Sequence, residues 1–370
     1  MTAHISKKLV SKQKKHLIMS KIKIFSIASA FLLTSAFLYS WSLSQPKFNE
    51  GLSGNIMSTV NVAPLTEAIT LAVNDAGEIL LVLNAGEQGI DTINLNDLTP
   101  NRYPDAADAF VDLGRNRLLD IASTEKTKNT PWEELSIPIS VTDKSIAAGT
   151  NYKAHMEEMG LEGNPPFLFP KLSRATSWDA EVTSGVRLDH EVELCALPLA
   201  DFSAGDTVEM AYLLCGDFTD RWLLVSDMDL GGEMGKTGFP LGKGGATRMP
   251  VGPFLVFPST PDFYKKIDLK LYVNSTLRQH SKADLMIWNP SEIMEHTLRD
   301  CESVYKRLDE ELGILDNCEK IPAKTLFLTG TPEGVMFHLG TIWNPAFYLR
   351  SGDVITASAT YLGVTKNSVN

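Results

Sequence analysis

The sequence predicts an α+β fold that is rich in β-strands and is preceded by a hydrophobic N-terminal segment. From about Gly149 to the end, short runs of β-favouring residues are bounded by Gly, Pro, Asn and Asp. Helical patterns are few and short. The chain has 370 residues and is 44% hydrophobic, which is enough for a sizeable core.

Residues 1–45 are expected to be a targeting segment. Ile24 to Leu43 carry no charge and follow seven lysines. About 20 apolar residues can span a bilayer, whereas a cleaved signal peptide needs only about 7–15. We therefore expect export, with a body that is periplasmic or membrane-anchored outside the cytoplasm. Cleavage before Gln45 and retention as an anchor both remain open, and the lysine-rich flank makes a buried core helix the weaker reading.

The charge distribution argues against a nucleic-acid partner. The formal net charge is −11, and without the seven N-terminal lysines it is −18. A body this acidic repels phosphate backbones. Contact with a membrane is expected only through the N-terminal segment.

Two domains are expected after the targeting segment. Residues 46–145 mix strand and helix patterns and are assigned to a small N-terminal domain, and residues 146–370 to a catalytic domain. Helices are expected around residues 151–160 and 300–313. The expected strands of the second domain include Val208–Cys215, Val251–Phe257, Ile267–Val273, Thr325–Thr329 and Val354–Tyr361.

The four cysteines divide into two pairs. Cys195 and Cys215 lie in apolar, strand-like runs and are expected to be buried thiols. Cys301 and Cys318 flank a segment in which apolar residues recur at four-residue spacing. In an oxidising compartment we expect these two to form a disulfide.

Three acidic residues accompany two apolar strand-like runs. Side chains alternate along a strand, so Glu191 and Glu193 share one face, and Asp217 follows the next run. Two carboxylates on one face are explained by a proton, by exposure to solvent or by a bound cation. Alone, an exposed strand face is the simpler reading. If a cation is bound, these oxygen ligands favour Mg²⁺, with Mn²⁺ or Ca²⁺ as alternatives, over Zn²⁺.

Other candidate residues surround this acidic set in the sequence. His155 and Glu158 are spaced i, i+3 on a short helix, which suits a general base oriented by a carboxylate, although a solvated helix would look the same. Lys243 lies in a glycine-rich loop that lacks the spacing of a phosphate-binding loop. Thr331 follows a strand, in an anion-binding or merely tight turn.

Taken in order, these segments resemble the fumarylacetoacetate hydrolase superfamily over about residues 148–368. The motifs are "GTNYKAHMEE", "DHEVEL", "GDFTDR", "GKGGATRMPVGP", "VNSTLRQ", "TGTPEGV", "YLRSGD" and "YLGVTKN". Gly216 replaces the family's asparagine, Leu224 its glutamine and Ser275 its turn glycine. These departures leave the identity of the substrate open.

The resemblance implies a catalytic domain with a mixed β-roll or sandwich fold, a smaller N-terminal portion and pairing into a homodimer. It also implies roles for particular side chains. These are metal binding by Glu191, Glu193 and Asp217, catalysis by His155, Glu158 and Lys243, and substrate binding by Arg221 and Thr331.

The leading hypothesis is divalent-metal-dependent hydrolysis of a C–C bond in a small β-diketo acid, such as an acylpyruvate or fumarylacetoacetate, through a metal-bound enolate. His155, polarised by Glu158, would activate water, and Lys243 would stabilise the oxyanion. Decarboxylation, hydration or isomerisation of an unsaturated 2-oxo acid is the first alternative. An exported, non-catalytic protein that binds oxo acids is the second.

Overall fold

The computed structural model describes residues 2–140, 142 and 144–370, and the chain divides into two compact units. One unit contains the residues up to Gln45 together with His338–Trp343. The other contains Pro46–Phe337 and Asn344–Asn370 and is called the catalytic unit below.

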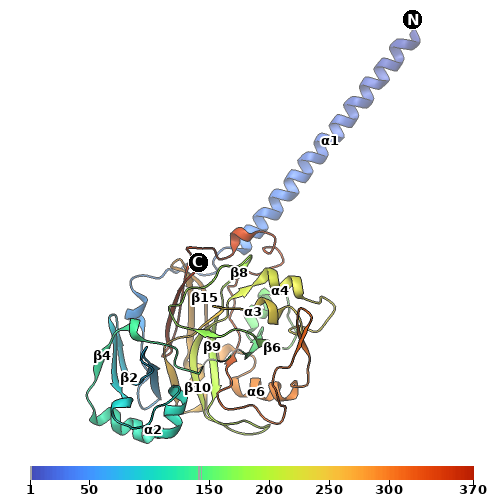
Figure 1. Ribbon diagram of the computed structural model, residues 1–370. Helices are drawn as coiled ribbons and strands as arrows, with labels where there is room; N and C mark the ends of the chain where they lie inside the picture. Colours follow the sequence, from blue (N-terminus) through green and yellow to red (C-terminus); the bar gives the residue numbers. More distant parts are fainter. Residues whose placement is uncertain (1, 141, 143) are drawn as a thin grey trace. The chain divides into compact units, whose positions relative to one another are not determined.

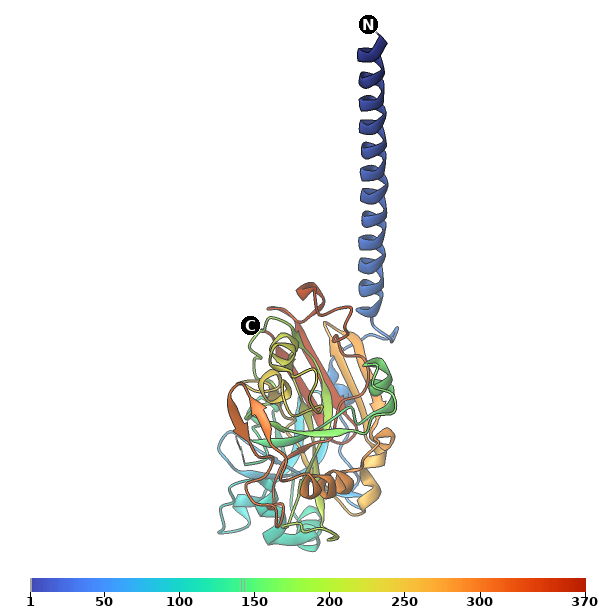
Figure 2. The same cartoon turned by 90° about the vertical axis from the view of Figure 1, so that its right-hand side faces the viewer.

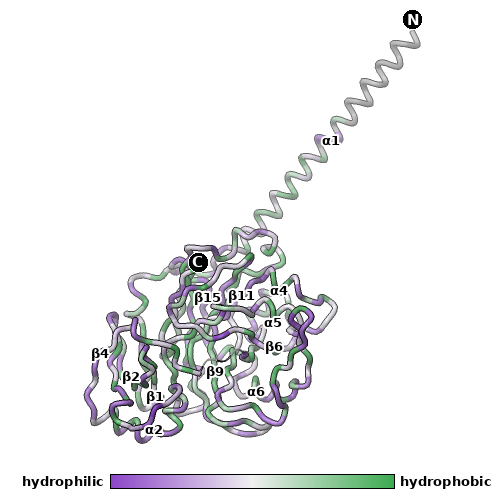
Figure 3. Tube along the Cα trace, viewed as in Figure 1, coloured by the Kyte–Doolittle hydropathy of each residue, from purple (hydrophilic) through white to green (hydrophobic). Residues whose placement is uncertain are grey.

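The first unit is built on one long helix, α1 (Thr2–Leu43). Its stretch Phe25–Leu43 is long and apolar enough to cross a membrane, by length and composition (Figure 3). A signal sequence passes the same test. The N-terminal targeting segment therefore stays a prediction.

A ten-stranded mixed sheet forms the centre of the catalytic unit (Figure 1). Its neighbours are antiparallel except β18 and β5, which are parallel. In spatial order the strands are β4 (Lys128–Thr130), β3 (Gly89–Asn94), β2 (Ile79–Gly86), β1 (Ala68–Val73), β13 (Leu255–Pro258), β10 (Met210–Gly216), β9 (Val192–Pro198), β18 (Phe327–Leu328), β5 (Ser145–Gly149) and β6 (Phe167–Lys171).

The strands of residues 46–145 extend this same sheet, because β1 pairs with β13. Both expected domains consequently lie in one compact unit. A domain boundary near residue 145 stays a prediction.

A second, antiparallel sheet lies against β9 and β10 (Figures 1 and 2). Its strands, in spatial order, are β15 (Thr276–Lys282), β14 (Asp268–Val273), β19 (Val354–Ala359) and β20 (Gly363–Ser368). β9 and β10 are buried along their whole length, and their apolar side chains form part of one continuous core with those of β14 and β20. The expected β-rich α+β class is confirmed.

Helices are short in the catalytic unit, apart from α2 (Ala106–Thr124), which packs on β1 and β2. Phe110 of α2 stacks on Phe257 of β13 at 4.0 Å between ring centroids. The other helices are α3 (Lys153–Glu158), α4 (Arg221–Asp227), α5 (Phe239–Gly242) and α6 (Pro290–Arg299). The remaining strands are β7 (Ala175–Thr176), β8 (Leu188–Asp189), β11 (Thr219–Asp220), β12 (Met249–Pro250), β16 (Tyr305–Arg307) and β17 (Glu310–Leu312).

All five expected strands and the helix at 151–160 are present, but the helix expected over 300–313 is wrong. That segment contains the β16–β17 hairpin, and Leu308 in its turn has a φ of 55°. A spacing of four residues fits the strand period of two as well as the helix period, so the pattern could not distinguish them. The helix that does form, α6, begins at a capping box between Asn289 and Glu292, which is a local signal.

Both cysteine pairs are joined as disulfides. The bridge between Cys301 and Cys318 is confirmed. Cys195 and Cys215 are buried as expected, but they also form a disulfide, so their assignment as thiols is wrong. They lie on paired strands with 5.9 Å between their Cα atoms, a separation that a disulfide spans. Only the pairing of β9 with β10 reveals this proximity.

Candidate active site

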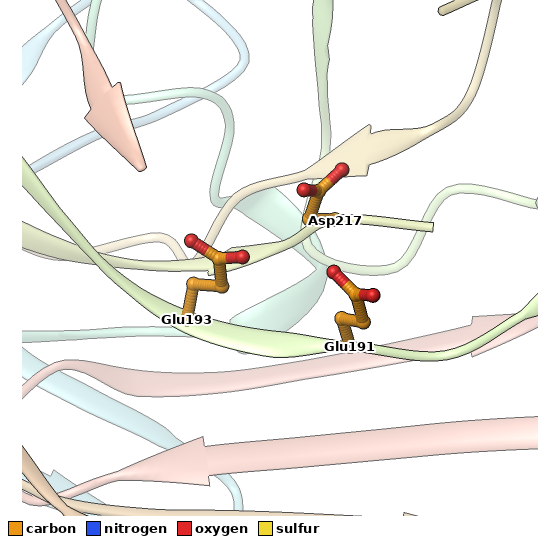
Figure 4. A group of neighbouring side chains, drawn as sticks. All are labelled: Glu191, Glu193 and Asp217. Atoms are coloured by element: carbon orange, nitrogen blue, oxygen red, sulfur yellow. The ribbon is translucent and has the colours of Figure 1, made fainter. Parts of the chain in front are cut away.

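Three buried carboxylates converge where β9 begins and β10 ends. Glu191 and Glu193 rise from the same face of one chain segment, and Asp217 faces them from the next (Figure 4). Each of the three residues is at most 2% exposed. One oxygen from each lies within 4.8 Å of the others. The alternative of a solvent-exposed strand face is therefore excluded.

Two buried lysines pair with Asp217, one at each oxygen of its carboxylate. The Nζ atom of Lys171 is 2.5 Å from Oδ1, and that of Lys243 is 2.7 Å from Oδ2. Lys243 also pairs with Glu191. Burial opposes the charge of Lys243, but Asp217 and Glu191 outweigh it and raise its pKa, so this lysine stays protonated. Lys171 was not anticipated, although a lysine ending the apolar run "FLFPK" was an available signal.

Arg221 holds Glu191 from the other side. Its guanidinium donates to Glu191 and, through Nε at 2.9 Å, to Asp189. Asp189 in turn accepts the backbone N–H groups of Met336 and Phe337. Asp189 was also missed, although alternation in "DHEVE" places it on the side of Glu191 and Glu193. The contact of Arg221 with a substrate carboxylate stays a prediction.

Glu193 lacks a basic partner at hydrogen-bonding distance among the described contacts of the site. Its carboxylate accepts the N–H of Gly330 at 2.6 Å. Burial, and then the charge of Asp217, raise the pKa of Glu193 well above its usual range, while Lys243 opposes this. A divalent cation among the three carboxylates would relieve this repulsion. The donor set, three hard oxygens, therefore fits such an ion.

A His–Glu pair lies on α3, as the sequence predicts. Nδ1 of His155 is 3.1 Å from Oε2 of Glu158. Glu158 also accepts the N–H of Gly334 at 3.1 Å and pairs with Lys47 at 2.8 Å. Burial alone would raise the pKa of Glu158, but His155 and Lys47 together hold it below its ordinary value. The carboxylate is thus ionised and able to orient the imidazole.

The segment Thr329–Phe337 connects the carboxylates to the His–Glu pair. Its Gly330 contacts Glu193, and its Gly334 contacts Glu158. Thr331 donates to the carbonyl of Val192 and accepts from Nε2 of Gln279. The substrate contact expected of Thr331 stays a prediction, and its hydrogen bonds anchor the turn to β9 and β15.

Fold and site together define a sheet-rich α+β protein with a buried cluster of carboxylates and a nearby His–Glu pair. The chain belongs to the fumarylacetoacetate hydrolase family, because the family's C-terminal domain, described as "Fumarylacetoacetate (FAA) hydrolase C-terminal", matches residues 144–370. The resemblance inferred from the motifs is confirmed.

Two curated relatives illustrate the range of this family. The chain is 28% identical to the 2,4-didehydro-3-deoxy-L-rhamnonate hydrolase of Sphingomonas sp. (strain SKA58) over 264 residues, which is 68% of this chain and 81% of the relative. It is 29% identical to the oxaloacetate tautomerase YisK of Bacillus subtilis (strain 168) over 250 residues, 64% of this chain and 73% of the relative.

Solved structures agree on the fold. A putative HpcE protein from Mycobacterium smegmatis aligns with a TM-score of 0.58 at 22% identity, covering 81% of this chain and 98% of its own. The fumarylacetoacetate hydrolase of Exiguobacterium antarcticum aligns with a TM-score of 0.56 at 20% identity, covering 82% and 99%. At such identities the similarity concerns the fold alone.

Proposed function

We propose that this protein is a divalent-metal-dependent hydrolase that cleaves a C–C bond in a small β-diketo acid of the acylpyruvate class. The observation that carries the proposal is the hydrogen-bonded pair His155–Glu158, connected to the buried carboxylates through one short segment. Gly330 contacts Glu193, and Gly334 contacts Glu158. The two glycines are four residues apart, so the chain that joins these contacts is at most about 14 Å long.

Glu191, Glu193 and Asp217 would hold the cation. When bound, it would act as a Lewis acid on the oxo-acid end of the substrate. Mg²⁺, Mn²⁺ and Ca²⁺ all accept such oxygen donors.

The protein's own groups would then supply the proton transfers. His155 would take a proton from the attacking water, while Glu158 orients its ring and stabilises the imidazolium. Water adds to the distal carbonyl, which becomes a carboxylic acid, and the electron pair of the breaking C–C bond leaves with the oxo-acid half. The departing carbon then takes up the proton from the imidazolium, which returns His155 to its neutral form. Lys243, which remains charged, would stabilise the negative charge on oxygen. Arg221 and Thr331 would contact the substrate carboxylate, and their hydrogen bonds also hold Glu191 and the turn in place.

The first test is turnover of acylpyruvates with Mg²⁺, with EDTA as the control. We expect His155→Ala to lower kcat by about 10²–10⁴-fold, the usual contribution of a general base. His280→Ala is the matched control, because His280 also pairs with a carboxylate, Asp268 at 3.0 Å, outside the contacts described for the site. Equal activity of the two variants would contradict the proposed role of His155.

A second measurement addresses the cation directly. Glu193→Gln removes one charged oxygen donor and should weaken Mn²⁺ binding in calorimetry by at least about 100-fold. Glu311→Gln, on the exposed strand β17, should leave binding unchanged. Unaltered Mn²⁺ affinity in Glu193→Gln would place the ion elsewhere.

Isomerisation or tautomerisation is the alternative that a specific observation favours, namely the similarity to an oxaloacetate tautomerase. A tautomerase or decarboxylase needs the cation but not an activated water. If the native protein tautomerised oxaloacetate but did not hydrolyse acylpyruvates, and His155→Ala left the tautomerisation intact, the second reaction would be the native one. Saturable binding of diketo acids without any turnover would instead indicate a non-catalytic binding protein.

We also propose that the catalytic unit is exported and anchored by α1. Two observations support this. The stretch Phe25–Leu43 is long and apolar enough to span a membrane, and all four cysteines are in disulfides. Disulfides persist in oxidising compartments and are rare in the cytoplasm.

A further inference from the structure

We infer that the loop His338–Trp343 is a second membrane contact, which enters the outer interface of the bilayer beside α1. The inference rests on the anchor proposed above and extends it to a part of the chain some 300 residues away in sequence. His338–Trp343 and α1 belong to one compact unit.

The loop touches the last two turns of α1 at three places. Ser40 donates a hydrogen bond to the carbonyl of Gly340. The rings of Phe37 and Trp343 meet edge to face with 6.4 Å between their centroids. A Cβ atom on Gly340 would lie 2.9 Å from Leu43 Cδ1, so the glycine backbone itself lies close to the helix.

The depth of these contacts follows from helix geometry. The 19 residues Phe25–Leu43 are about 28 Å long at 1.5 Å per residue, close to the ~30 Å hydrocarbon core of a bilayer. Phe37 lies six residues before Leu43, or about 9 Å along the axis. Anything that packs against Phe37 of a spanning helix must therefore lie within the outer leaflet or its headgroup region.

The composition of the loop suits that position. Leu339 is 90% exposed and Trp343 is 52% exposed. His338 is the only ionisable residue between Glu333 and Arg350 apart from Tyr348. Trp and Tyr favour the interface, because an apolar ring and a polar N–H or O–H group are both satisfied there.

Aromatic residues near the end of α1 would lie at the same membrane depth as Trp343. Tyr39 and Trp41 are exposed near its C-terminal end. Together with Trp343 they form an aromatic girdle of the kind found where spanning segments leave the lipid. Lysines precede Phe25–Leu43 at the opposite end of the helix, as is typical of the cytoplasmic side of a spanning segment.

This arrangement also bears on cleavage of α1. Cutting before Gln45 would remove Phe37, Ser40 and Leu43 and leave the loop without the helix that it contacts. We therefore infer that α1 is retained as an anchor.

The test uses the full-length protein in vesicles of phosphatidylcholine and phosphatidylglycerol. Leu339→Cys is labelled with an environment-sensitive fluorophore, which is selective because the native cysteines are bridged. The matched control is Leu230→Cys, which is equally exposed (89%) but lies in the catalytic unit. Neither position is buried, so both variants should fold.

At position 339 we expect blue-shifted emission and quenching by spin-labelled lipid acyl chains several-fold stronger than at position 230. Equal emission and quenching at the two positions, in a protein whose intact mass includes α1, would overturn the loop contact alone. An intact mass beginning at Gln45 would overturn the anchor and the loop contact together. Neither result would affect the proposed hydrolysis, which is measured separately.

Discussion

The buried ionic cluster shows how much of the site depends on single side chains. Glu191 and Asp217 are each held by two basic residues, whereas Glu193 is not. The basic residues thus pair with Glu191 and Asp217 and leave Glu193 without a countercharge among the described contacts. A divalent ion bound among the three carboxylates would supply the missing positive charge.

Lys171 should be essential to the stability of this cluster. Lys171→Met leaves Asp217 short of one cation in a buried place, which typically costs about 3–5 kcal/mol of unfolding free energy. Urea unfolding in EDTA measures the loss, and added Mn²⁺ should restore part of it.

The control for this prediction is Lys320→Met. Lys320 also lies 2.5 Å from its partner, Asp201, but both side chains are about half exposed, so the change should be much smaller. Equal losses in the two variants would contradict the role of burial.

At the scale of elements, the segment Thr329–Phe337 depends on a glycine. Gly334 has a φ of 106°, and a Cβ there would lie 1.9 Å from the carbonyl oxygen of Arg278. Its N–H donates to Glu158, and its carbonyl oxygen is 3.2 Å from Nε2 of His190. Burial lowers the pKa of His190 to about 4, so this imidazole is neutral at pH 7 and can donate through Nε2.

Gly334→Ala should therefore lose both stability and turnover. Gly352→Ala separates the causes, because Gly352 has a φ of 93° but open space around its Cβ position. Backbone strain alone should cost about 1–2 kcal/mol in Gly352→Ala, and steric overlap should add to this in Gly334→Ala. Thermal unfolding and kcat for both variants check the prediction, and a fully active Gly334→Ala would refute it.

Helix α2 should contribute a pH-dependent stability through its N-cap. Burial alone would raise the pKa of Asp105, but hydrogen bonds from Ser140 and Asp108 and the charge of Lys324 lower it below its ordinary value. A depressed pKa contributes stability above about pH 4, which is lost as pH falls through the native pKa.

Asp105→Asn keeps a capping oxygen but removes the charge. The unfolding free energy of the native protein should exceed that of Asp105→Asn at pH 7, and the difference should shrink as pH falls below about 4. Urea unfolding at a series of pH values measures it. A difference that does not change with pH would exclude the ionised carboxylate as its source.

At the scale of the whole molecule, the two disulfides have different positions relative to the site. They close loops with sequence separations of 20 and 17 residues, so each should contribute about 3 kcal/mol. Cys195 and Cys215 each lie two residues from a carboxylate of the cluster, Glu193 and Asp217.

We expect the double variants Cys195→Ala/Cys215→Ala and Cys301→Ala/Cys318→Ala to lose similar stability in urea. Only the first should also weaken Mn²⁺ binding, because it releases the two strands that present the ligands. Calorimetry on both variants decides this, and equal Mn²⁺ affinities would argue against the coupling. The homodimer implied by the family remains a prediction that light scattering would test.

The sequence by itself determined the β-rich class, five strands of the catalytic unit and the acidic set, because alternation and apolar runs are local properties of the chain. Ordered motifs also placed His155 beside Glu158, since i, i+3 neighbours meet on any helix. The partners of these residues were decided by tertiary structure.

Lys171, Asp189 and the bridge between Cys195 and Cys215 illustrate the difference. Each acts on a residue in another part of the chain, and that neighbour is known only once β9 is paired with β10 and the positions of β6, β8 and α4 are set. The hairpin at residues 305–312 was misjudged because its spacing fits two periods, and only packing chooses between them. Long-range pairing is a property of the folded chain, which no local pattern contains.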